Sequence, residues 1–295
     1  MGIFDRFKKR ETSKETEPKA EHSDLYLALE NLKKSQSPDV MAELAKVMKA
    51  YVDDGTWAPM PIIQDSKGNR LRIIQARGKP YAVMYSDETE VKSSGSIIMT
   101  DINKLLEPVF QNPEIAGIII DPETTSLCMD KGFLLKCILH GYLPRVHNNG
   151  SPPKNWGNGI PQYSQSDLMA EGEMLNFAMH TVLDHEDALS SMTLVSACDH
   201  LAAVPNLIFE NKGQFVFIVV KGYCAEDEPV LPAKIRSLLQ SYQQRFGAVC
   251  YYAPVGFRST DSDRFNACLA LKGDGFYAKY EGLADPFRAS PENLY

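Results

Sequence analysis

The chain has little of several features that would narrow its function. No apolar run in its 295 residues approaches the roughly 18 that a membrane-spanning helix needs, and the N-terminus carries no signal-peptide core. Lys and Arg number 31 against 38 Asp and Glu. The formal charge of -7 argues against a general nucleic-acid binder, which needs cations to displace phosphate counterions. We therefore expect a cytoplasmic protein without general nucleic-acid binding.

The six cysteines follow no recognisable pattern, because they are scattered along the chain without a close pair. Zinc knuckles and redox dithiols usually place two of their cysteines about two residues apart, so the spacing excludes both kinds of site. We expect reduced thiols that pack as small hydrophobic side chains. No catalytic motif of recognisable spacing is present, so the sequence predicts no catalytic residue and no cofactor.

What the sequence does contain is the composition of a globular α+β protein with two domains. Hydrophobic residues make up 44% and charged residues 23%, which is ordinary for folded domains. A length of 295 residues is long for a single core. Local composition divides the chain into a tail over 1–22, a first domain over 23–140, a Gly- and Pro-rich linker over 141–165 and a second domain over 166–295.

The tail over 1–22 has too few apolar residues to offset the entropy of ordering it, so we expect it to be a disordered tether. Its first ten residues combine four basic side chains with an apolar edge formed by Ile3, Phe4 and Phe7. A short basic amphipathic helix of this kind can touch an anionic membrane surface weakly or dock on a partner. The alternative is a frayed chain start without a binding role.

Helical and extended patterns alternate through the first domain. Leu25, Leu29 and Leu32 recur at helical spacing, and Ser37-Pro38 predicts the cap and first residue of a second helix. Further patterns predict a helix capped by Asp101 and strands at 57–63, 97–99 and 115–120. Between the first two strands, a hairpin is expected over 71–85, with its turn at Arg77-Gly78-Lys79. Ser86 is expected to cap the acidic turn that follows this hairpin.

Three segments of this domain resemble the N-terminal domain of the SseB family, bacterial proteins named for enhanced serine sensitivity. The Y-x-P opening strand of that family is similar to Trp57-Ala58-Pro59, and its Phe-Thr-Ser segment before acidic residues is similar to Met84-Tyr85-Ser86-Asp87-Glu88. Its return strand is similar to Gly117-Ile118-Ile119-Ile120-Asp121-Pro122, although the family usually has Asn before the Pro. The resemblance implies a bacterial protein with a mixed sheet and helices. It implies no mechanism, because these segments are turns and strand ends.

The linker over 141–165 contains candidate binding residues. Arg145, His147 and Trp156 combine a cation, an imidazole and a large aromatic ring in a loop of polar and turn-forming residues. Such a loop can contact a partner. The alternative is that the tryptophan pins the loop to the surface of a domain.

Apolar periodicity in the second domain predicts the order helix, three strands, helix, strand, with a last strand near 276–280. At the end of its first helix, His180 and Asp184 are four residues apart and so share a face, and His185 follows directly. Two such ligands make a candidate metal site, which would still need a third ligand. A solvated helix end is the alternative.

The same order of elements is the skeleton of restriction-endonuclease-like domains. Those enzymes need one acidic residue on a strand and an acidic-x-Lys pair on the next, to hold a divalent cation beside the phosphate. Asp199 and Lys221 fit two of these positions, but Val219 stands where the second carboxylate is required. The sequence therefore predicts a nuclease-like domain without the nuclease chemistry, if it is nuclease-like at all.

Two hypotheses of function follow. The first is a non-catalytic bacterial scaffold, adaptor or regulatory binding protein with an unidentified protein partner. The second is an enzyme with a dispersed, metal-assisted site in the second domain, built around His180, Asp184 and His185 or around Asp199 and Lys221.

Overall fold

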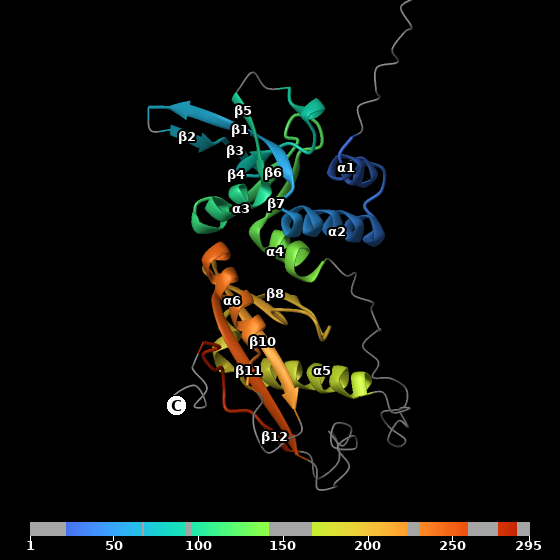
Figure 1. Cartoon of the computed structure of the whole chain (residues 1–295), viewed down its shortest axis with the longest axis vertical. Helices are drawn as coiled ribbons and strands as arrows, with labels where there is room; N and C mark the ends of the chain where they lie inside the picture. Colours follow the sequence, from blue (N-terminus) through green and yellow to red (C-terminus); the bar gives the residue numbers. More distant parts are fainter. Residues whose placement is uncertain are drawn as a thin grey trace, which may run out of the picture.

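The computed structural model describes residues 22–66, 68–92, 96–141, 167–223, 230–258 and 277–287, and over these ranges the fold is α+β. Two sheet-containing domains are stacked end to end (Figure 1). Helix α4 (Lys131–His140) of the first domain and helix α6 (Ala233–Phe246) of the second lie at their junction. No helix in the described ranges combines the length and the apolar character needed to cross a membrane.

The first domain begins with a helical hairpin and continues as two small sheets. Its other elements are α1 (Asp24–Lys34), α2 (Pro38–Asp54), β1 (Trp57–Asp65), β2 (Gly68–Leu71), β3 (Ile73–Ala76), β4 (Lys79–Met84), η1 (Glu88–Glu90), β5 (Ser96–Asp101), α3 (Ile102–Gln111), β6 (Gly117–Ile120) and β7 (Leu127–Asp130). The predicted Ser37 cap is confirmed, since its side chain accepts from Val40 N. The predicted Asp101 cap is also confirmed, with Asn103 N as donor at 2.8 Å.

The sheets have the strand orders β2-β1-β5 and β3-β4-β6-β7, and only β4 and β6 are parallel. Backbone hydrogen bonds join them, because Tyr85 N donates to Pro59 O at 2.9 Å and Arg72 N donates to Pro61 O at 3.2 Å. In a strand the N–H and C=O of one residue point to the same edge. Pro59 and Pro61 are therefore tolerated in the central strand β1, since their missing N–H groups face away from β5.

The second domain is one five-stranded sheet with a long helix on one face. Its other elements are α5 (Asp167–His185), η2 (Asp187–Ser191), β8 (Thr193–Ala197), β9 (Leu207–Asn211), β10 (Gln214–Tyr223), β11 (Val249–Arg258) and β12 (Tyr277–Lys279). The strand order is β12-β11-β10-β9-β8, and α6 connects the parallel pair β10 and β11. The predicted order of helix, three strands, helix and strand is confirmed.

Strand β10 is buried on both faces, and its alternating side chains belong to two different cores. Val216, Ile218 and Val220 pack with α5 in a cluster confined to the second domain. Phe215, Phe217 and Val219 belong instead to a cluster that includes residues of α1, α2, α3 and α4. Helix α6 and the first domain together cover the second face of this sheet, because Phe217 also contacts Tyr242 and Phe246 of α6. The two domains therefore share a continuous core.

An aromatic cluster lies at the centre of this shared core. The ring of Phe110, at the end of α3, meets the ring of Phe246 in α6 edge-on, with centroids 4.9 Å apart. It also meets Phe215 of β10 at 6.0 Å. Edge-to-face pairs of this kind add to the free energy gained by burying the rings. Helix α3 is thereby fixed against the second domain.

Candidate functional site

The segments that carried the family resemblance meet in space. Asp121 follows β6 with 1% of its surface exposed, and both of its carboxylate oxygens accept hydrogen bonds from Ser86. The Ser86 N–H donates at 2.8 Å and the Ser86 hydroxyl at 2.6 Å. The prediction that Ser86 caps a helix is wrong. Asp87 caps η1 instead, accepting from Thr89 N, while Ser86 is held in the interior by Asp121.

This Ser86–Asp121 contact has the character of a structural tie. Asp121 adopts φ +49°, a conformation in which Asp and Asn are the favoured non-glycine residues. Burial raises the pKa of its carboxyl, and the two hydrogen bonds from Ser86 act in the opposite direction. Both side chains are buried, so the pair positions two loops without facing solvent.

Asp121→Asn is expected to stay within about 1 kcal/mol of wild type, whereas Asp121→Ala loses about 2 kcal/mol by leaving the buried donors of Ser86 unpaired. The folded chain holds the Asp121 proton above the ordinary pKa of 3.8, so ionisation weakens the wild type as pH rises through that range. The Asn variant should therefore gain on wild type between pH 4 and pH 7 in urea unfolding. An Asn variant as unstable as the Ala variant would contradict this account.

The metal-site candidates lie at the exposed end of α5. His180, Asp184 and His185 are all solvent-exposed, and His185 Nδ1 lies 3.1 Å from the Thr181 carbonyl, to which it donates. Within the described ranges, no group of three His, Cys, Asp or Glu side chains is placed to hold a metal ion. Among the described residues, the structure therefore brings no third ligand to His180 and Asp184.

The three positions compared with a nuclease site differ in their exposure to solvent. Val219 has 5% of its surface exposed and packs in the shared core, whereas Asp199 and Lys221 are exposed. A carboxylate at position 219 would lie among apolar side chains, because α6 and the first domain cover this face of the sheet. The packing thus gives a physical reason for the missing acidic residue.

Several other candidates lie outside the described residues. These are Arg145, His147 and Trp156 of the predicted linker and Ile3, Phe4 and Phe7 of the tail. Among the cysteines that are described, Cys137, Cys198 and Cys250 are buried free thiols and Cys128 is a partly buried one. The expectation of buried, unpaired thiols is confirmed for the first three.

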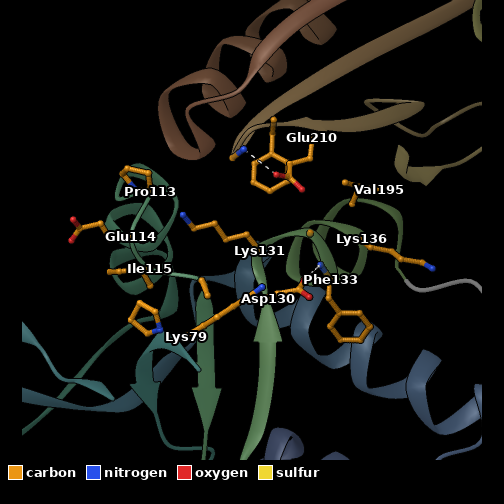
Figure 2. Close-up of a pocket in the computed structure, with 15 residues that line it drawn as sticks. Lys79, Pro113, Glu114, Ile115, Asp130, Lys131, Phe133, Lys136, Val195 and Glu210 are labelled. Atoms are coloured by element: carbon orange, nitrogen blue, oxygen red, sulfur yellow. Dashed lines mark hydrogen bonds between the residues drawn. The ribbon is translucent and has the colours of Figure 1, made fainter. Parts of the chain in front are cut away.

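A cleft of about 640 Å³ lies between the domains and is here called the inter-domain cleft (Figure 2). One wall comes from the first domain: the start of β4, the loop before β6 and the start of α4. The other comes from β8 and from the β9–β10 hairpin of the second domain. The charged lining residues are Lys79, Glu114, Asp130, Lys131, Lys136 and Glu210, and the largest apolar ones are Ile115, Phe133, Val195 and Phe215.

The start of α4 sets the geometry of the first wall. Asp130 caps the helix by accepting from Phe133 N at 2.7 Å, and Lys131 N donates to Ala116 O at 3.0 Å. The Lys131 side chain lies in the middle of the cleft and reaches toward the loop that carries Pro113 (Figure 2). Its Nζ donates to the Asn112 carbonyl at 2.8 Å.

The electrostatics of the cleft centre on Lys131. Burial lowers the pKa of its ammonium, because the half-buried side chain has lost part of its hydration. The carboxylates of Asp130 and Glu210 each accept a hydrogen bond from the backbone N–H three residues later in the chain. The donors are Phe133 N and Gly213 N respectively. In chemical terms the cleft offers cations, carboxylates and apolar walls, which together suit the binding of a polar chain.

The site is not among the sequence predictions, because no element is predicted over residues 123–140. Two residue types in the sequence indicate this helix. Asp130 is a favoured N-cap residue, and Gly141 is the favoured residue type directly after a helix, where it adopts φ +58°. Leu134, Leu135 and Ile138 lie between them at helical spacing and are buried. These signals predict α4, although they do not predict that a second domain closes the cleft.

The far end of α4 forms a second contact between the domains. His140 is 9% exposed, and its two ring nitrogens lie 2.7 Å from Ser196 Oγ and 2.8 Å from Pro205 O. A carbonyl only accepts, so Nε2 carries the proton and Nδ1 accepts from the Ser196 hydroxyl. Desolvation lowers the pKa of His140, the bond to Pro205 acts against this, and the nearby Lys136 lowers it further.

The stability of the protein is expected to fall as pH drops below about 6.5, the ordinary pKa of histidine. His140 is held neutral in the folded state, so the unfolded chain binds the proton more readily and protonation favours unfolding. His140→Gln should reduce this pH dependence and cost about 1–2 kcal/mol at pH 7.5. Urea unfolding at pH 5, 6.5 and 7.5 measures both effects, with the exposed His180→Gln as control. An unchanged pH slope in His140→Gln would contradict the assignment.

A family model described as a domain of unknown function (DUF8840) matches residues 172–286. The match begins within α5 and ends after β12, and so includes the β9–β10 hairpin that forms one wall of the cleft. No curated protein and no solved structure matches the chain significantly. The second domain is thus similar to the DUF8840 family, whose description carries no activity.

Proposed function

We propose that this chain is a non-catalytic bacterial binding protein, a scaffold or adaptor, that recruits a protein partner through its inter-domain cleft. In this proposal residues 23–140 are an SseB-like domain and the protein acts in the cytoplasm. The observation that carries the proposal is the cleft itself. Both domains line it, and its charged and apolar side chains can hold a partner by ion pairs and hydrophobic contact.

The shared core supports this function because it holds the two walls in place before a partner arrives. Phe110 packs on Phe215 and Phe246, and His140 bonds to Ser196 and to the Pro205 carbonyl. A site whose walls are already ordered loses less conformational entropy on binding than one that must be assembled.

The test is affinity capture of the full chain from its native cells, comparing wild type with a variant whose cleft is filled. Val195 lines the cleft and faces Gly132, since a Cβ added to Gly132 would lie 3.4 Å from Val195 Cγ1. Val195→Trp should therefore remove the partner. Leu194→Trp is the matched control, because Leu194 is the preceding residue of β8 and is 38% exposed.

We expect the partner to be recovered with wild type and Leu194→Trp and lost with Val195→Trp, and the purified pair to bind in calorimetry. Circular dichroism and thermal unfolding verify that each variant is folded. Equal capture by all three proteins would contradict binding at the cleft. A turnover activity that survives purification would favour the alternative of an enzyme.

A further inference from the structure

Lys131 presents an uncompensated cation to the inter-domain cleft. Its Nζ uses one of its three protons on the Asn112 carbonyl, at 2.8 Å. Among the described residues, no carboxylate oxygen lies within 4.0 Å of this ammonium. A half-buried ammonium has lost hydration that a carbonyl alone does not replace, so an anion beside it would be stabilised.

The carboxylates of the cleft do not supply that anion. The Glu114 side chain points away from Lys131 (Figure 2). Asp130 Oδ1 is held by Phe133 N at 2.7 Å, and Glu210 Oε1 is held by Gly213 N at 2.9 Å. These bonds direct both carboxylates to their own backbone. Lys79, which is exposed at the rim of the same wall, adds a second positive charge to the lining of the cleft.

Apolar side chains lie next to the two cations. Phe133 and Val195 are partly buried and line opposite walls, and Ile115 and Phe215 are buried parts of the lining. The volume of about 640 Å³ falls within the range of about 300–1,000 Å³ typical of ligand sites. The space is too large for an inorganic anion alone, and its walls suit an anion that is attached to apolar groups.

An extended peptide meets these requirements because its successive side chains point to opposite sides. One acidic side chain can then face Lys79 and Lys131, while an adjacent apolar side chain contacts Val195 on the opposite wall. Glu210, on that same opposite wall, disfavours a second acidic residue at the neighbouring position.

We propose that the inter-domain cleft binds an extended peptide segment of a partner protein through one acidic side chain, contacted by Lys131 and Lys79, and an adjacent apolar side chain, contacted by Val195 on the opposite wall. This inference rests on the proposed function and names the chemistry of the partner. Charge complementarity with the two lysines selects the acidic residue, and the walls select its apolar neighbour.

An array of synthetic decapeptides with randomised sequences, probed with the full chain, tests the inference. We expect the bound peptides to be enriched in Asp or Glu next to an apolar residue. Fluorescence anisotropy on the tightest peptide should show affinity falling about tenfold or more when Lys131 becomes Met, as for loss of one charged contact. Lys131→Arg should retain binding, and Lys104→Met, an exposed lysine of α3, should have no effect.

A change in the peptide keeps the test independent of protein folding. Replacing the acidic residue of the peptide by Gln or Asn should weaken its binding to the wild-type protein as strongly as Lys131→Met does. Sodium acetate should not displace the peptide more than sodium chloride does at the same ionic strength. Array peptides without acidic enrichment, or acidic peptides that bind Lys131→Met unchanged, would overturn the inference. So would an array without bound peptides. A partner captured by wild type and lost with Val195→Trp would in each case leave the proposed function intact.

Discussion

Replacing Phe110 by alanine is expected to lower the free energy of unfolding by about 4 kcal/mol, as large-to-small changes at buried aromatic sites do. The Phe110 ring is 7% exposed and contacts Phe215 and Phe246, which belong to the other domain. The loss therefore falls on the shared core. We also expect the single cooperative transition of wild type to separate into two, because each domain keeps part of its own core. Calorimetry and urea unfolding measure both results.

Two comparisons sharpen this prediction. Leu27→Ala removes an apolar side chain that is 49% exposed on α1, and should change stability by no more than about 0.5 kcal/mol. Phe110→Leu keeps most of the buried volume and should cost clearly less than alanine. If Phe110→Ala unfolds like Leu27→Ala, the aromatic cluster does not hold the domains together.

Gly117→Ala is expected to lower the free energy of unfolding by about 3 kcal/mol or to prevent folding, as overpacking of a well-filled core does. A Cβ at this position in β6 would lie 2.0 Å from the Met129 carbonyl oxygen and 2.8 Å from Asp130 Cα, both backbone atoms of β7. The β7 backbone cannot move aside without breaking the β6–β7 pairing. The glycine is therefore required by the close approach of two strands.

Gly172→Ala provides the matched control. Gly172 lies in α5, and a Cβ there would meet nothing within 4 Å. Alanine should stabilise this helix by up to about 1 kcal/mol, since glycine is the poorer helix former. Thermal unfolding that shows equal effects at Gly117 and Gly172 would contradict the described β6–β7 packing.

Local patterns predicted most of the elements. The leucines of α1, the Ser37-Pro38 start of α2 and the Asp101 cap of α3 are signals carried by neighbouring residues, and the structure confirms them. The apolar spacing in α3 outweighed Pro108, which the helix tolerates in its interior. Ser86 failed as a predicted cap because its partner, Asp121, is distant in sequence.

The relation of the domains was harder to predict, because it depends on contacts between distant segments. The apolar run from Phe215 to Val220 indicates a strand covered on both faces. A sequence shows that a second face is covered, but not by what. Helix α5 covers one face, and α6 together with the first domain covers the other, so the inter-domain cleft had no signature in the linear chain.

The central claim is that both domains jointly form one binding site, and amide hydrogen exchange of the full chain, free and saturated with the captured partner, tests it most directly. The partner should slow exchange together at 113–116 and 131–136 of the first domain and at 209–215 of the second, because these segments line the cleft. Protection confined to one domain, or located away from these segments, would contradict the claim.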